Sequence, residues 1–239
     1  LAIHEETYAE IKGRKELRGS LTIRIPQTIA TYYLPPVLVK FPKCYPRVRF
    51  EFQSCTVHPL AQELSAGTID LAFLLTESIQ AGSLQAEVLG FENLFLVTHP
   101  ENPLAKKPSI RFQDLQGQVL LYPRTDCDYP VRFQKMLADE KIKLTTSVGF
   151  NSVEAVKQCV IAGLGITLVP AVAVRREVQS GALTILRLSE EPLEVAIFMI
   201  WHRDKWLSPS LDAFLETVKE NFKNGSQEPS SDQNGQLSA

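Results

Sequence analysis

The sequence has few of the features that mark an enzyme or a metalloprotein. Its four histidines stand apart and lack the i, i+4 spacing or neighbouring cysteines of a zinc site. It contains neither the G-x-S-x-G motif of serine hydrolases nor the G-x-x-x-x-G-K-[ST] loop that binds nucleotide phosphates. Gly163-Leu-Gly165 lacks the third glycine of a dinucleotide-binding turn and precedes a strand-like run rather than a helix. We therefore expect no catalysis, no metal and no cofactor.

Long apolar runs, an export signal and closely spaced cysteines are also missing. No apolar run reaches the roughly 18 residues of a membrane span, and the first residues are polar and charged. The four cysteines have no short paired spacing, so we expect reduced thiols in a cytoplasmic protein that does not associate with membranes. The net charge of −2 argues against a chain that binds nucleic acid over its whole surface.

What the chain does contain is an α/β pattern. Residues 21–25 and 48–52 alternate apolar and polar side chains, as half-buried strands do, and a helical segment separates them. A second helix leads into the apolar run 69–75, which is typical of a strand buried on both faces. A similar order follows, with strands expected at 93–97, 119–122, 145–150, 166–169, 183–188 and 196–201, and helices at 131–140, 153–162 and 208–221. The pattern predicts two α/β halves.

Small polar residues follow the expected strands, where helices should begin. Parallel sheets collect ligands at the carboxyl ends of their strands, and free N–H groups at helix starts favour anions. We expect Thr28, Thr56, and either Asn151 or Ser152 to cap three of these helices, so that the caps line one cleft if the halves face each other. Each could instead be only a cap. The predicted ligand-binding residues are Gln27, Thr28, Ser54, Thr56, Pro123, Arg124, Thr125, Asp126, Cys127, Asn151 and Ser152.

Two side chains in the loop after residue 122 leave alternatives open. Arg124 is the only cation in these loops and could bind a carboxylate or phosphate through two hydrogen bonds, or could pair with Asp126 or Asp128. Cys127 lies at an expected helix start, where the helix dipole favours a thiolate, whereas the two flanking aspartates disfavour it. We favour a pocket-lining role for this cysteine over a redox-sensing one.

A set of short motifs lies in order along residues 19–222. They are G-S-L-T-I-R at 19–24, L-P-P at 34–36, Y-P-x-V at 45–48, G-x-I-D-L-A at 67–72, L-x-G at 115–117, L-L-Y-P at 120–123 and A-G-L-G-I-T-L-V-P at 162–170. Together they resemble the effector-binding domain of LysR-type transcriptional regulators. The resemblance implies two Rossmann-like subdomains with a cleft between them, a fold like that of type II periplasmic binding proteins.

The resemblance also implies how the chain is divided. Residues 1–18 would be the end of a linker helix, 19–97 with 200–222 would form subdomain I, and 98–199 would form subdomain II. The polar segment 223–239 is expected to be a disordered tail. The winged helix-turn-helix that precedes this domain in the family is absent from the sequence, so we expect the chain to be part of a longer protein.

The implied function is regulation of transcription by a small effector, polar or carboxylate-bearing, that binds in the cleft. The implied partners are further copies of the chain, in a homodimer or tetramer that pairs the helix starting near Leu34 with helix 153–162, and promoter DNA and RNA polymerase through the full-length protein. Peroxide-sensing members carry a second cysteine nine residues after the reactive one, where this chain has Met136. Two alternatives stay open: a solute-binding protein of a transport system, and a thiol-based redox sensor through Cys127.

Overall fold

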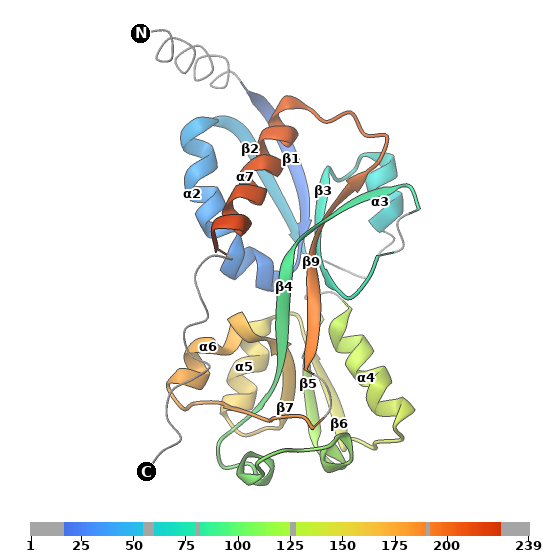
Figure 1. Ribbon diagram of the computed structural model, residues 1–239, viewed down its shortest axis with the longest axis vertical. Helices are drawn as coiled ribbons and strands as arrows, with labels where there is room; N and C mark the ends of the chain where they lie inside the picture. Colours follow the sequence, from blue (N-terminus) through green and yellow to red (C-terminus); the bar gives the residue numbers. More distant parts are fainter. Residues whose placement is uncertain (1–16, 55–59, 80–81, 125–127, 190–191, 226–239) are drawn as a thin grey trace.

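Two long antiparallel strands, β4 (Leu84–Thr98) and β9 (Leu193–His202), connect the two lobes of the molecule (Figure 1). The computed structural model describes residues 17–54, 60–79, 82–124, 128–189 and 192–225. One sheet runs through both lobes in the order β2-β1-β3-β9-β4-β7-β5-β6. Because β4 and β9 pair with each other and with strands of both lobes, any change in the angle between the lobes must be absorbed along these two strands.

The first lobe is a parallel α/β unit with helices on both faces of its sheet (Figure 1). Its elements are β1 (Arg18–Ile25), α2 (Pro35–Cys44), β2 (Arg47–Ser54), α3 (Leu60–Ala66), β3 (Leu71–Thr76) and α7 (Pro209–Gly225). Strand β1 pairs in parallel with both β2 and β3, as the strand–helix–strand pattern predicts. Its apolar positions Leu21, Ile23 and Ile25 are buried, and Phe41 of α2 packs edge-to-face on Phe214 of α7.

The second lobe repeats this arrangement. Its elements are β5 (Val119–Pro123), α4 (Tyr129–Asp139), β6 (Thr146–Phe150), α5 (Val153–Ile161), β7 (Ile166–Pro170), α6 (Ala171–Gln179) and the short β8 (Thr184–Ile185). Strand β5 pairs in parallel with β6 and β7. Helix α5 buries Val156 and Val160 against Val97, Leu121 and Val169 of the sheet. Gly165 lets β7 begin close to β5, because an added Cβ would collide with the backbone of Val119.

The sequence predictions differ from the structure at three elements. Strand β4 begins at Leu84 rather than near residue 93, and a bulge at 88–90 interrupts the alternation of its first half. The strand predicted at 183–188 shrinks to β8, because the chain turns away from β4 after Leu186 and pairs with Ile110 instead. Helix α6 was not predicted, since its nine residues present only a short apolar stripe.

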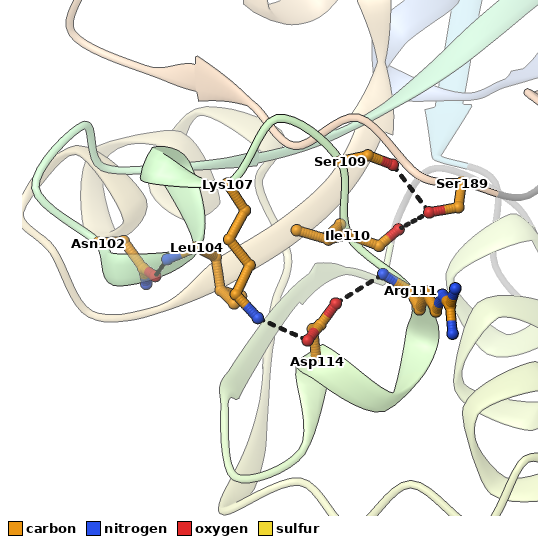
Figure 2. A network of polar contacts seen from close by, with 8 residues as sticks. All are labelled: Asn102, Leu104, Lys107, Ser109, Ile110, Arg111, Asp114 and Ser189. Carbon is orange, nitrogen blue, oxygen red and sulfur yellow. Dashed lines mark hydrogen bonds and ion pairs between the residues drawn. The ribbon is translucent and has the colours of Figure 1, made fainter.

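A network of polar contacts holds the segment between β4 and β5 at the end of the second lobe that lies away from the first (Figures 1 and 2). Asp114 accepts hydrogen bonds from the backbone N–H of Arg111 at 2.8 Å and from Lys107 Nζ at 2.6 Å. Ser189 Oγ lies 2.8 Å from Ser109 Oγ and donates to the carbonyl of Ile110 at 3.0 Å. These contacts fix the loop and lie outside the region between the lobes.

Candidate functional site

A hollow of about 260 Å³ lies where the ends of β1 and β2 approach the start of α5. Three of the predicted ligand-binding residues line it, namely Gln27 and Ser54 from the first lobe and Asn151 from the second. The other lining residues, which the sequence patterns did not indicate, are Ile25, Ala30, Phe52 and Gln53. Phe52 and Gln53 directly precede Ser54, so the end of β2 could have pointed to them. The hollow is therefore lined by amide and hydroxyl groups together with one aromatic side chain and two aliphatic ones.

Gln27 links the two lobes at this hollow. Its Oε1 accepts the backbone N–H of Val153 at 2.8 Å. Val153 opens α5, and N–H groups in a first helical turn have no acceptor within their own helix. Of the two predicted cap candidates, Asn151 and Ser152, Ser152 is the N-cap of α5, and its Oγ accepts the N–H of Ala155 at 3.3 Å. The start of α5 thus presents donors to the space between the lobes, and one is held by a carboxamide oxygen.

The prediction that Thr28 caps the first helix is wrong. Its backbone is helical (φ −59°, ψ −47°) rather than extended, and its side chain makes no capping bond. The reason is that the helical turn already begins at Gln27 and continues as the π-helix η1 (Ile29–Tyr33), in which the Leu34 N–H bonds to the Ile29 carbonyl at 3.0 Å. Thr28 is fully buried and does not reach the surface of the hollow. Single π-helical turns are frequent at functional sites.

The β5 exit places Pro123 and Arg124 beside β6. Pro123 is buried, whereas the Arg124 side chain is exposed and its backbone N–H donates to the Phe150 carbonyl at 2.8 Å. Gly149 makes room for this side chain, since an added Cβ would lie 2.5 Å from Arg124 Nε and 2.9 Å from Tyr122 Oη. Arg124 forms no ion pair within the described ranges. The predicted site residues Thr56, Thr125, Asp126 and Cys127 lie outside the described residues, so the redox alternative for Cys127 stays a prediction.

A second set of contacts between the lobes joins the end of β3 to α4. Thr76 Oγ1 lies 3.0 Å from Asp128 Oδ2, and Glu77 forms an ion pair with Arg132. The sequence shows Thr76 directly after a buried strand, but gives no signal for its partner, which lies 52 residues further along the chain. The cleft is therefore bridged on the α4 side as well as on the α5 side.

A third set of contacts centres on Glu92, in the part of β4 that crosses between the lobes. Glu92 Oε1 accepts the N–H of Val172 in the first turn of α6 at 3.0 Å, and the hydroxyl of Tyr33 from η1 donates to Oε2. Tyr32 Oη donates to the carbonyl of Ala173 at 3.3 Å. Burial raises the pKa of Glu92, while the hydrogen bonds from Tyr33 and Val172 oppose this effect. No sequence pattern indicates this cluster, because a lone glutamate in a strand carries no sequence signal.

Over the described ranges, no group of three or more histidine, cysteine, aspartate or glutamate side chains is placed to hold a metal ion. The helices of those ranges include none with the length and apolar character needed to cross a membrane.

Comparison with known proteins gives matches over nearly the whole chain. The sequence profile described as "LysR substrate binding domain" matches residues 14–223. The chain is 30% identical over 224 residues to the HTH-type transcriptional regulator YwqM of Bacillus subtilis (strain 168), covering 93% of this chain and 76% of that protein. It is 26% identical over 219 residues to the HTH-type transcriptional regulator GltR of the same organism, covering 92% and 72%.

Solved structures match the fold. The regulatory domain of Synechocystis PCC6803 CcmR in complex with 2-PG superposes with a TM-score of 0.75 at 21% identity, covering 87% of this chain and 99% of that one. The effector-binding domain of QuiR in complex with shikimate gives a TM-score of 0.70 at 18% identity, covering 87% and 99%. The predicted fold, two Rossmann-like subdomains like those of type II periplasmic binding proteins, is confirmed.

Proposed function

This chain belongs to the LysR family of transcriptional regulators, as its substrate-binding domain, and we propose that its effector binds in the hollow between β1, β2 and α5. The family consists of regulators rather than enzymes, and its substrate-binding domain binds small molecules. This sets aside the alternative of a solute-binding protein for transport. The observation that carries the proposed location is the Gln27–Val153 hydrogen bond, because it joins both lobes at a polar hollow.

The lining of the hollow favours a small polar effector, including one with a carboxylate. Gln27, Gln53 and Asn151 can each donate and accept hydrogen bonds through their carboxamides. The start of α5 favours negative charge, so a carboxylate oxygen of the effector could take the place of Gln27 Oε1 on the Val153 N–H. Arg124, at the neighbouring strand end, is a cation that could pair with the same group. In relatives the ligand is 2-PG for CcmR and shikimate for QuiR.

The proposed response is a shift in the relative position of the lobes. An effector that contacts Gln27 and Asn151 together touches both lobes, and it stabilises whichever arrangement it fits better. In the proposed full regulator, this shift would reposition DNA-binding domains at a promoter and alter contact with RNA polymerase, within a homodimer or tetramer in the cytoplasm. We propose that the two moving units, expected from the sequence at 19–97 with 200–222 and at 98–199, meet within β4 and β9 near Glu92 and Val195. Residues 94–98 of β4 pair with β7 of the second lobe, and residues 196–200 of β9 pair with β3 of the first.

A metabolite screen followed by matched variants tests the location. Thermal shift identifies an effector, because a ligand at 100 times its Kd stabilises the folded state by about 2.7 kcal/mol. Asn151→Ala and Arg124→Gln should each lower the affinity for that effector about 10- to 150-fold, since a hydrogen bond to a charged group contributes about 1.5–3 kcal/mol. The control is Arg203→Gln, which removes an exposed arginine from the loop after β9 and should leave affinity unchanged. Wild-type affinity in both cleft variants would show that the effector binds elsewhere.

A further inference from the structure

The Glu92 carboxylate is buried at the point where the two lobes meet. Its residue is only 7% exposed, and its oxygens accept hydrogen bonds from Val172 of the second lobe and Tyr33 of the first. No ion pair reaches it within the described part of the chain. Arg175 of α6 is near enough to lower the pKa of Glu92, but the two do not pair directly. A buried carboxylate that lacks a counter-ion is costly, so the site favours a cationic group from outside the chain.

A hollow of about 710 Å³ opens beside Glu92. Aromatic side chains from three elements line it: Tyr33 of η1, Phe91 of β4 and Phe222 of α7. Phe91 is 66% exposed and directly precedes Glu92 in β4, so the two side chains point to opposite faces of the strand. Aromatic faces attract ammonium groups, and the ring that lies against Glu92 is that of Tyr33, whose hydroxyl donates to it. Arg175, an exposed cation, also lines this hollow.

We propose that this hollow is a second ligand site, separate from the cleft at Gln27, and that it binds a small zwitterion of the amino-acid type. The ammonium group would face Glu92 and the aromatic rings, and the carboxylate would pair with Arg175. The hollow provides a carboxylate (Glu92) and a guanidinium (Arg175) that are not paired with each other. Val172 and Ile197 add apolar surface beside them. A ligand with both charges and an apolar side chain matches all three features.

Occupancy of this site would act on the angle between the lobes. Its lining comes from η1 and α7 in the first lobe, from α6 in the second, and from β4 between them. The existing contacts of Tyr33 and Val172 with Glu92 already join these parts. A ligand held by Glu92 and Arg175 would add a bridge beside them, so it would couple to effector binding through the same motion.

The first measurement is calorimetric titration of this chain with each of the twenty standard amino acids. The best binder is then compared with two analogues, one without the ammonium group and one without the carboxylate. Both analogues should bind at least about tenfold more weakly, since each loses a charged hydrogen-bonding group. The absence of binding by every amino acid at about 10 mM overturns the proposal. So does an analogue that binds as tightly as the parent amino acid.

Variants then locate the binding. Arg175→Ala and Glu92→Gln should each lower the affinity for the amino acid that binds best at least about tenfold. Glu92→Gln keeps an oxygen that can accept the Val172 N–H, and Arg175 is exposed, so at least the arginine variant is expected to fold. The control is Arg176→Ala, which removes the neighbouring exposed arginine of α6 and should bind as the wild type does. If Arg175→Ala binds the amino acid with wild-type affinity, the assignment of the second ligand site to this hollow is wrong. This conclusion does not depend on the result for the cleft variants Asn151→Ala and Arg124→Gln.

Discussion

At the scale of single residues, the side chains that matter most join segments that are distant in sequence. Gln27 reaches Val153 across 126 positions, and Tyr33 reaches Glu92 across 59. Burial raises the pKa of Tyr33, and the charge of Glu92 raises it further, so this hydroxyl remains a neutral donor. Both pairs join segments that meet where the two lobes approach each other.

The raised pKa of Glu92 predicts a pH dependence of stability. In the unfolded chain this carboxyl has its ordinary pKa of 4.5, and in the folded protein burial raises the pKa above that value. The folded state therefore binds the proton more tightly than the unfolded state does. The contribution of the protonated Glu92 carboxyl to the free energy of unfolding is complete below pH 4.5 and is lost as pH rises through the pKa of the folded protein. Glu92→Gln, which does not titrate, should gain stability relative to the wild type as pH rises.

Urea unfolding of both proteins between about pH 4 and pH 8 measures this change. The control is Glu101→Gln at an exposed loop position, which should follow the wild type at every pH. A difference between Glu92→Gln and the wild type that stays constant over this range would contradict the assignment of a raised pKa.

At the scale of elements, α5 connects the cleft to the core of the second lobe. Its start carries the Ser152 cap and the bond from Gln27, and its body is tied to α6 through Lys157, which pairs with Glu177 at 2.6 Å. The side chain of Lys157 is only 5% exposed, so this pair is shielded from solvent. Lys157 thus joins α5 to α6, the helix whose first turn contacts Glu92.

Removal of the α5 cap should lower stability. Ser152→Ala leaves the Ala155 N–H without its acceptor, and loss of an N-cap costs about 1 kcal/mol. Urea unfolding should show a lower midpoint with an unchanged slope. Ser147→Ala, at an exposed position of β6, is the control and should change the free energy of unfolding by less than about 0.5 kcal/mol. Equal stability of the two variants would mean that the Ser152 cap contributes nothing.

At the scale of the whole molecule, two lobes share two strands and, among the residues that the structure describes, are joined by three separate sets of contacts. The contacts are Gln27 with α5, Thr76 and Glu77 with α4, and Tyr33 and Glu92 with α6. Strands β4 and β9 connect the lobes through a continuous sheet (Figure 1). A change in the angle between the lobes would therefore bend these strands and shift packing in the main apolar cluster, which includes side chains of both lobes.

The outer surface of α2 leads us to expect self-association. Val39 of α2 is 62% exposed, and Leu164, in the turn that follows α5, is 48% exposed. Apolar side chains therefore face solvent on α2 and beside α5, the two helices named in the proposed dimer. Val39→Glu should weaken a dimer at least about tenfold, because burial of one valine contributes about 1.5–3 kcal/mol. Sedimentation velocity over a concentration series measures this effect.

The matched control is Val131→Glu, because Val131 of α4 is 59% exposed and lies outside the proposed interface. The Val131→Glu dimer should sediment as the wild-type dimer does. A wild-type chain that is monomeric at tens of micromolar, or a Val39→Glu dimer as strong as the wild type, would rule out α2 as the interface.

The sequence by itself determined most elements of both lobes, because the alternation of apolar side chains in β1 and the helical spacing in α5 are local patterns set by burial on one face. It also placed Gln27, Ser54 and Asn151 at strand ends, and the parallel topology brings such ends together. It could not show the buried position of Thr28, the full length of β4 or the second hollow. Each of these depends on partners that only the folded chain supplies. Glu92 is the clearest case, since its environment consists of η1, α6 and α7, and no pattern near residue 92 specifies any of them.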